Sequence, residues 1–291
     1  MLKGRIIKGV GGLYFVDTNE GVFKCNARGI FRKDNIKPAV GDFVFISEIP
    51  SLDDVPEKTG VIEEIIPRSN MLKRPWVANV QQAIIVFSIV SPSINLDLLD
   101  RIIVLAEEQG LEIVICLNKA DLSPEAEMLK IRELYENVGY RVIYVSAKSG
   151  IGIAEVEEVL NGKTSVFAGP SGVGKSSITN CLIPSAQMEV GEISGKISRG
   201  KHTTRHAELL QVGQLSYIVD SPGFSNISFE HIKRNELKLY FKEFGDNDKC
   251  RFHDCLHLNE PECFVKAQIG KDIAPVRYDR YVRFLDDVGS N

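Results

Sequence analysis

The chain has 291 residues, of which 44% are hydrophobic and 25% are charged, and its formal net charge is −4. This composition is typical of a soluble globular protein long enough for two or three hydrophobic cores. No apolar run approaches the roughly 20 residues of a transmembrane helix, and the first residues lack the apolar core of a secretory signal. We therefore expect a cytoplasmic monomer without a membrane partner.

The first 66 residues contain five short β-rich segments separated by glycine-containing turns. The segments are residues 5–7, 13–16, 22–25, 43–46 and 61–66. Five short strands in this length favour a small β-barrel, with an OB-fold as the leading candidate. The sequence predicts this barrel over residues 1–66 and a linker over residues 67–75.

Two basic segments stand out against the net negative charge of the chain. Residues 196–205 contain four basic residues and no acid, and residues 24–37 contain five basic residues and one acid. Either segment suits contact with RNA phosphates, and either could instead be a solvated loop. The segment at residues 24–37 also contains Phe31, whose ring could stack on a base. The five basic residues there are Lys24, Arg28, Arg32, Lys33 and Lys37.

Alternating strands and helices occupy residues 76–227. Strands are expected at residues 83–87, 113–117, 142–145 and 165–168, and helices at 96–109, 124–138 and 154–160. Ser123 would be the N-cap of the second helix, with Pro124 at its first position. This alternation is typical of a parallel sheet covered by helices on both faces.

A phosphate-binding loop of the G-x-x-x-x-G-K-[ST] type follows the strand at 165–168. Its glycines allow backbone N–H groups to converge on phosphate oxygens, and the following helix adds its N-terminal N–H groups. Lys175 is placed to reach the β- and γ-phosphates, and Ser176 to ligate Mg²⁺. The expected nucleotide contacts are Gly169, Pro170, Ser171, Gly172, Val173, Gly174, Lys175, Ser176 and Ser177.

Three further motifs complete a guanine-nucleotide site. Asp121 of Asn118-Lys119-Ala120-Asp121 can accept paired hydrogen bonds from guanine, which adenine does not offer. The loop Ser146-Ala147-Lys148 resembles the one whose backbone supports the guanine carbonyl. Asp220 and Gly223 match D-x-x-G, which sits behind Mg²⁺ and senses the γ-phosphate. Alone, residues 118–121 could be a turn before a helix; beside the other motifs they indicate GTP or GDP.

The order of these motifs is rotated, because the guanine reader at residues 118–121 precedes the phosphate loop. The sequence therefore predicts a circularly permuted α/β P-loop GTPase domain, which the usual proximity of chain ends permits. The segment after Gly223 leads into the C-terminal region, so nucleotide-dependent movement could pass along that connection.

Residues 228–291 are expected to form a mostly α-helical zinc-binding domain. Cys250, Cys255, His257 and Cys263 supply the Cys₃His composition of a structural zinc site, while incidental cysteines are the alternative. His253 is not counted as a ligand. A helix over residues 229–244 would bury an apolar stripe, and its basic residues would be solvated or contact rRNA; they are Lys233, Arg234, Lys238 and Lys242. The isolated Cys25, Cys116 and Cys181 are read as small buried residues.

These motifs together resemble the ribosome small subunit-dependent GTPase A family (RsgA, also called YjeQ or YloQ), over the whole chain. The resemblance implies an OB-fold, a permuted GTPase domain and a zinc domain, whose four ligands match the residues above. It also implies GTP hydrolysis stimulated by the 30S subunit, a role in late 30S maturation, and contact with 16S rRNA.

Hydrolysis needs a group that orients water, and Phe224 occupies the position where Ras-like GTPases carry glutamine. The loop at residues 199–204 resembles switch I, with Thr203 or Thr204 sensing Mg²⁺. His202 beside them is the expected catalytic residue, a role proposed for the equivalent histidine in the family. A solvated loop histidine or an RNA contact is the alternative for His202. For the whole chain, the alternatives are a non-catalytic GTP-gated RNA-binding module and a GTPase acting on another translation-related RNA.

Overall fold

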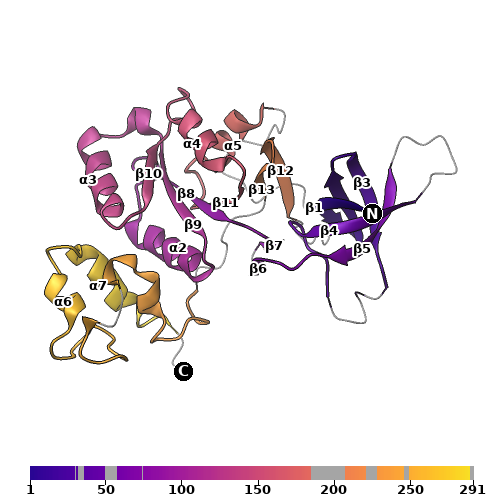
Figure 1. Cartoon of the computed structure of the whole chain (residues 1–291). Coiled ribbons are helices and arrows are strands. Elements are labelled where there is room, and N and C mark those ends of the chain that lie inside the picture. Colours follow the sequence, from indigo (N-terminus) through magenta and orange to yellow (C-terminus); the bar gives the residue numbers. More distant parts are fainter. Residues whose placement is uncertain are drawn as a thin grey trace.

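The computed structural model describes residues 1–29, 31, 36–49, 58–73, 75–184, 207–220, 228–245 and 249–288. A β-barrel, a helix-covered sheet and a C-terminal unit around a Cys/His cluster follow one another along the chain (Figure 1). The predicted architecture is confirmed. Within these ranges no helix combines the length and the apolar character needed to cross a membrane.

The barrel contains β1 (Leu2–Val10), β2 (Leu13–Thr18), β3 (Gly21–Ala27), β4 (Phe43–Ile49) and β5 (Thr59–Ile65). Its strand order is β1-β2-β3-β5-β4, and the antiparallel pairing of β1 with β4 closes it. Alternate residues point inward, as the two-residue period of a strand requires. Ile6, Val16 and Phe23 are fully buried in its core. All five expected strands are present.

The basic segment of the barrel differs from its prediction at Phe31. The ring is only 8% exposed and belongs to the hydrophobic core, so it is not available to stack on a base. Burial of the ring removes apolar surface from water, a gain that an exposed position would forgo. Arg28 pairs with Glu63 at 2.7 Å, and Arg32 and Lys33 lie outside the described residues.

The segment expected as a linker contains regular structure. β6 (Met71–Lys73) forms a two-stranded hairpin with β7 (Trp76–Ala78). Asn79 follows it in the left-handed region, at φ 57°. Its side chain accepts a hydrogen bond from the backbone N–H of Ser69 at 2.8 Å and donates one to the Gly41 carbonyl at 3.0 Å. Asn79 therefore ties this connection to the barrel.

The central sheet has the order β10-β9-β8-β11-β13-β12. The first five strands are parallel, and β12 runs antiparallel to β13. The bounds are β8 (Gln82–Ser88), β9 (Glu112–Asn118), β10 (Arg141–Tyr144), β11 (Thr164–Ala168), β12 (Glu208–Gly213) and β13 (Ser216–Asp220). β12 was not predicted, because its residues are mostly half-exposed and lack a continuous apolar run.

Helices cover both faces of this sheet (Figure 1), and every residue of β8 is buried. They are α2 (Leu96–Glu108), α3 (Glu125–Glu136), α4 (Ile153–Leu160) and α5 (Lys175–Leu182). Asn95 caps α2 by accepting a hydrogen bond from the Leu98 N–H. The predicted cap of α3 is wrong by one residue: Pro124 is the N-cap, and Ser123 instead ends the short 3₁₀ helix η1 (Ala120–Leu122) and donates to the Lys119 carbonyl.

The permutation is visible in the strand order. β11, which leads into the phosphate loop, lies at the centre of the sheet between β8 and β13. The half-sheet β8–β10 comes from the chain before it, and β12–β13 from the chain after it. Because parallel strands all end at one edge of the sheet, the segments after β8, β9 and β11 meet there despite their rotated order.

The C-terminal unit contains η3 (Leu237–Tyr240), η4 (Lys242–Phe244), α6 (Phe264–Gln268) and α7 (Pro275–Phe284). The continuous helix expected over 229–244 is absent, because Phe241 adopts an extended conformation between two 3₁₀ turns. That conformation packs Phe241 and Phe244 against Tyr281, with ring centroids 5.2 and 4.8 Å away. The expected apolar stripe is nevertheless core.

The basic residues of this segment are not all solvated. Lys238 is 6% exposed and donates to the carbonyls of His253 and Cys255 at 3.2 and 2.9 Å. Lys242 pairs with Glu107 of α2 at 2.9 Å. The expectation of a solvated surface is therefore wrong for Lys238, whose buried ammonium satisfies backbone carbonyls that would otherwise lack donors.

A buried ionic cluster joins the C-terminal unit to α2 and α3. Asp100 of α2 accepts hydrogen bonds from Arg277 and Arg280 of α7, at 2.5 and 2.6 Å, and from Tyr135 of α3 at 2.7 Å. Arg277 also binds Glu243 through two nitrogens, at 2.7 and 3.1 Å. We call these five residues the α2–α7 clamp. Asp100, Tyr135, Arg277 and Arg280 are buried, and the Glu243 side chain is only 3% exposed, so the clamp fixes the C-terminal unit against the helices that flank β9.

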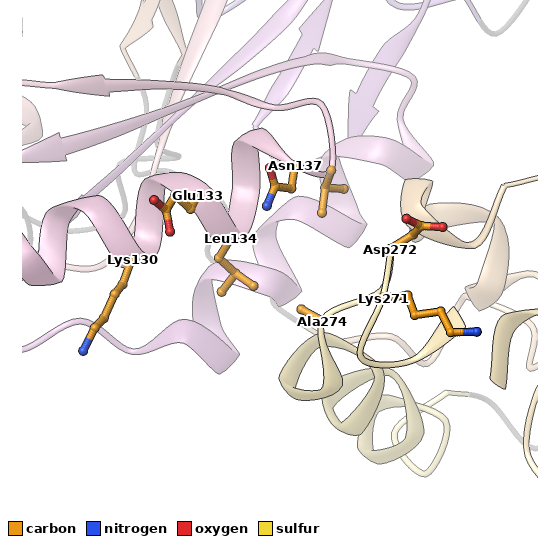
Figure 2. Close-up of a pocket in the computed structure, with 8 residues that line it drawn as sticks. Lys130, Glu133, Leu134, Asn137, Lys271, Asp272 and Ala274 are labelled. Atoms are coloured by element: carbon orange, nitrogen blue, oxygen red, sulfur yellow. The ribbon is translucent and has the colours of Figure 1, made fainter. Parts of the chain in front are cut away.

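Beside the clamp, a groove of about 280 Å³ separates α3 from the loop that precedes α7. Figure 2 shows Leu134 of α3 and Asn137, which caps the end of α3, on one side, and Lys271, Asp272 and Ala274 on the other. Its lining mixes both charges, and it lies away from the nucleotide motifs.

Candidate nucleotide site and metal cluster

The phosphate loop requires glycine at the positions where the backbone passes close to neighbours. Gly169 has φ 132°, and a Cβ there would lie 2.1 Å from the Val86 carbonyl oxygen. Gly174 has φ 96°, and a Cβ there would lie 2.2 Å from Nδ2 of Asn118. Only glycine adopts such backbone angles without strain. The loop therefore folds tightly from the end of β11 into the start of α5.

Lys175 is the first residue of α5, and its side chain lies against the loop. Its ammonium donates to the carbonyls of Gly169 and Pro170 at 2.8 and 2.7 Å. Burial lowers the pKa of this lysine. Both hydrogen bonds are made to neutral carbonyls, so an anionic phosphate oxygen would be the stronger acceptor.

Asn118 connects three of the predicted motifs. Its Nδ2 donates to the Val173 carbonyl of the phosphate loop at 2.8 Å, and its Oδ1 accepts from the Ala147 N–H at 3.2 Å. Lys119, at φ 60°, donates to the carbonyls of Gly172 at 2.9 Å and of Ser91. The phosphate loop, residues 118–121 and residues 146–148 are thus held together by hydrogen bonds.

A cavity of about 400 Å³ opens between these motifs. On its wall, Oδ1 of Asp121 accepts a hydrogen bond from the Ser146 hydroxyl at 2.6 Å, and that hydroxyl accepts one from the Ser149 N–H at 3.2 Å. This pair of bonds fixes the Asp121 carboxylate. The lining residues are Ser91, Asn118, Lys119, Asp121, Leu122, Ser146, Ala147, Lys148, Gly174 and Ser177.

Eight of the expected nucleotide residues line this cavity, namely Asn118, Lys119, Asp121, Ser146, Ala147, Lys148, Gly174 and Ser177. Ala120 begins η1 and donates its N–H to the Val145 carbonyl at 3.0 Å, Ser171 is exposed in the loop, and Ser176 lies in the first turn of α5. Two lining residues, Ser91 and Leu122, were missed. Ser91 belongs to the loop after β8, where no motif marks it, while Leu122 could have been inferred from its place beside Asp121.

Most of the predicted switch residues lie outside the part of the chain that the structure describes. His202, Thr203, Thr204 and Gly223 lie outside the described residues, as does Phe224. β13 ends at Asp220, of which the structure describes the backbone.

Cys250, Cys255, His257 and Cys263 form the predicted metal cluster, and their ligand atoms lie within 4.8 Å of one another. Nδ1 of His257 is 3.6, 3.4 and 3.4 Å from the sulfurs of Cys250, Cys255 and Cys263. Metal–sulfur and metal–nitrogen bonds of tetrahedral zinc imply a sulfur–nitrogen edge of about 3.6 Å. The cluster could therefore hold a metal ion, and His253 is not part of it.

The protonation of the cluster suits a cation. Burial lowers the pKa of His257 to about 4, so its imidazole is neutral near pH 7, which is the form that ligates metal ions. Burial raises the pKa of the Cys255 thiol to about 12. Thiolates at this depth require a positive charge beside them, and a metal ion supplies it.

Side chains around the cluster hold its backbone in place. The Tyr278 and Tyr281 hydroxyls donate to the carbonyls of His257 and Leu256 at 2.6 and 2.8 Å. Glu260 accepts from the N–H groups of Leu256 and Leu258 at 2.6 and 2.8 Å. Such outer contacts orient metal ligands.

The three remaining cysteines are separate from the cluster. Cys25 and Cys116 are fully buried, as expected. Cys181 is only half-buried, and its thiol lies 3.3 Å from the Ala147 carbonyl.

Comparison with known proteins identifies the family. The RsgA N-terminal domain matches residues 3–53, and the RsgA GTPase matches residues 65–230. A protein of Alkaliphilus metalliredigens named small ribosomal subunit biogenesis GTPase RsgA is 45% identical over 293 residues, which cover 100% of this chain and 99% of that protein. The chain belongs to the RsgA GTPase family. It is therefore a GTP hydrolase.

Further RsgA proteins and solved structures agree with this assignment. The protein of the same name from Clostridium perfringens strain 13 is 46% identical, covering 99% of this chain and 98% of its own. YjeQ from Thermotoga maritima has a TM-score of 0.83 at 39% identity, covering 98% and 97% of the two chains. YloQ, described as a circularly permuted GTPase, has a TM-score of 0.80 at 36% identity, covering 98% and 94%.

Proposed function

We propose that this RsgA-family GTPase binds the 30S ribosomal subunit, hydrolyses GTP to GDP and phosphate under its stimulation, and acts in late maturation of the subunit. The observation that carries the nucleotide part is Asn118, whose amide joins the phosphate loop to the guanine-reading segments around one cavity. The names of the curated relatives support the ribosomal part.

In this proposal GTP occupies the cavity with guanine against Asp121 and its triphosphate in the phosphate loop. The fixed Asp121 carboxylate would accept from the guanine ring N–H and exocyclic amine. Lys175 would release the two loop carbonyls and bind phosphate oxygens. Mg²⁺, held by Ser176 and Thr203 or Thr204 with Asp220 behind it, would neutralise phosphate charge.

For the attacking water we propose His202 as the positioning or proton-accepting group, since Phe224 cannot hold water. Arg199 and Arg205 would neutralise charge in the transition state or bind rRNA. We further propose that 16S rRNA contacts the basic residues of the barrel, that the protein is a cytoplasmic monomer, and that the metal is zinc. The units proposed for these roles are residues 1–66, 76–227 and 228–291, with 67–75 connecting the first two.

The test is GTP turnover by the full-length protein with and without purified 30S subunits. We expect slow hydrolysis by the free protein and acceleration by 30S, but not by 50S subunits or tRNA. Co-sedimentation with 30S should be stronger with a non-hydrolysable GTP analogue than with GDP. No turnover under any condition would favour the non-catalytic RNA-binding module, and acceleration by another RNA would contradict the 30S assignment.

The role of His202 is tested by His202→Ala. The variant should lose the accelerated rate, by about 100-fold or more for a group that acts on the water, while its affinity for GTP stays near that of the natural chain. Retention of the accelerated rate would assign water positioning to another residue.

A further inference from the structure

The barrel and the GTPase sheet are continuous. β1 of the barrel pairs with β12, so that all eleven strands from β10 to β4 form one hydrogen-bonded sheet. The β12–β13 hairpin lies between the barrel and β11 (Figure 1). This hairpin connects the two switch regions, because residues 199–204 precede β12 and D-x-x-G begins at the last residue of β13.

One row of residues crosses this junction. Lys8 of β1 lies opposite Glu208 of β12, and Glu208 in turn lies opposite Asp220 of β13. The Lys8 ammonium is 2.8 Å from the Glu208 carboxylate. Two acidic residues at facing positions of an antiparallel pair disfavour the pairing, and a neighbouring cation relieves that effect. Lys8 of the barrel is this cation, and the row ends at Asp220 of the D-x-x-G motif.

A second contact reaches the other strand of the hairpin. The Tyr217 hydroxyl on β13 donates to Asp17 of β2 at 3.0 Å. The guanidinium of Arg5 lies 4.9 Å from the centroids of both Tyr217 and Phe43, between a ring of the GTPase sheet and a ring of the barrel. Arg5 is 7% exposed, and a desolvated cation between two aromatic faces is held more strongly than an exposed one.

β13 is also the direct neighbour of the phosphate-loop strand. Tyr217, Ile218 and Val219 pair in parallel with Thr164, Ser165 and Val166 of β11. The barrel therefore binds both strands of a hairpin whose last residue is Asp220 and whose inner strand borders β11. A shift of the barrel would therefore change the spacing between Asp220 and the phosphate-loop strand.

We propose that Lys8 and Asp17 are positioning residues for GTP hydrolysis: through Glu208 and Tyr217 they set the place of Asp220 beside the phosphate loop. The inference rests on the proposed function for the role of Asp220. It makes the barrel a part of the catalytic assembly as well as a binding module. A partner that binds the barrel then acts on the hydrolysis step without contacting the nucleotide.

The test compares Lys8→Glu with the swapped pair Lys8→Glu/Glu208→Lys, in the full-length protein. Single-turnover GTP hydrolysis is measured with and without 30S subunits, and the Kd for GDP by fluorescence titration. Lys8→Glu places three acids in one row and should lower the hydrolysis rate constant about fivefold or more, the lower end of measured couplings between sites. The Kd should change less than about twofold, and the swapped pair should restore the rate.

Arg141→Glu is the matched control. It changes the charge by the same amount and breaks an exposed ion pair with Glu158 on the far edge of the sheet. Its hydrolysis rate should equal that of the natural chain. Should Lys8→Glu fold poorly by circular dichroism, Tyr217→Phe replaces it, since this change keeps the ring and removes only the hydrogen bond to Asp17.

The outcomes separate the two proposals. A natural chain that 30S does not stimulate contradicts the proposed function, while the intrinsic rates still test the positioning role. A Lys8→Glu rate equal to the natural one overturns the positioning role. So does a swapped pair that stays slow, or an equal loss in Arg141→Glu.

Discussion

Asp121 shows how a single side chain can select the base. The Ser146 hydroxyl donates to one of its oxygens and holds the carboxylate against the cavity. A carboxylate only accepts hydrogen bonds, so its partner must present donors, and guanine presents two on one edge.

Asp121→Asn should therefore change base preference from guanine to xanthine. The amide can donate to the carbonyl that xanthine carries in place of the guanine amine. Loss of two charge-assisted hydrogen bonds at about 1.5–3 kcal/mol each predicts a fall in GTP affinity of about 100-fold or more. Fluorescence titrations with GTP and XTP measure it. Equal weakening for both nucleotides would mean that Asp121 does not contact the base.

Gly174→Ala should weaken nucleotide binding while leaving the fold intact. Its methyl group would lie 2.2 Å from Nδ2 of Asn118, and alanine is strained at φ 96°. The expected loss in GTP affinity is about tenfold or more, given a strain of about 1–3 kcal/mol. Gly162→Ala serves as the control, because a Cβ there meets nothing within 4 Å although its φ is also positive. Similar losses in both variants would indicate a general effect of positive φ.

At the residue scale, the sequence predicts motifs far better than it predicts exposure. Gly169, Gly174, Asn118, Lys119 and Asp121 each have a local reason for their place, namely a turn, a close approach or a hydrogen bond. No local feature of the sequence explains the positions of Phe31 and Lys238. Their burial depends on strands and loops distant along the chain, so a basic stretch that suggested an open RNA surface instead contains a core ring.

At the scale of the elements, α2 contacts both the central sheet and the C-terminal unit. One of its faces packs on the sheet, and Val104 and Leu105 belong to the hydrophobic core of the C-terminal unit. Asp100, on the same helix, receives two arginines from α7. The partners are 177 and 180 residues away in the chain, which is why no sequence pattern indicated the clamp.

Arg277→Met should destabilise the contact between α7 and α2. It leaves Asp100 and Glu243 buried with one fewer cation, and breaking a buried pair in this way costs about 3–5 kcal/mol. Thermal unfolding and hydrogen exchange of α7 measure the effect.

Arg283→Met is the matched control, because Arg283 lies on the same helix and pairs with Asp97 at the surface, where its side chain is 61% exposed. Its cost should stay within about 1 kcal/mol. A similar small cost for Arg277→Met would mean that the clamp contributes little.

Helices and strands that bury one face match the hydrophobic periodicity of the sequence. The five barrel strands overlap their predicted segments, and the helices α2 to α4 are near their predicted bounds. β12 was not predicted because its residues are mostly half-exposed and form no apolar run. The 3₁₀ turns at 237–244 were not predicted because their packing depends on the rings of α7, which are distant in the sequence.

For the molecule as a whole, we predict that metal binding at the Cys/His cluster stabilises the structure of the C-terminal unit. The unit has few regular elements, and its core surrounds Cys255, Cys263 and their neighbours. Structural zinc contributes about 10–16 kcal/mol of binding free energy to such modules.

A zinc-selective chelator should therefore unfold residues 228–288 while the GTPase sheet and barrel remain folded. Metal analysis before and after chelation, with hydrogen exchange resolved by region, gives the measurement. GDP binding should persist, since no cluster residue lines the nucleotide cavity. Unchanged exchange in the C-terminal unit after complete metal loss would contradict a structural role.

The rotated strand order also has a consequence for biosynthesis. Within the GTPase sheet, β8, β9 and β10 are translated first. The β8 edge of this half-sheet stays unpaired until β11 is translated. The β12–β13 hairpin, which pairs with the other side of β11 and with β1 of the barrel, is translated later still. The pairing of β1 with β12, which joins the barrel to the GTPase sheet, therefore cannot form until β12 has been translated, long after β1.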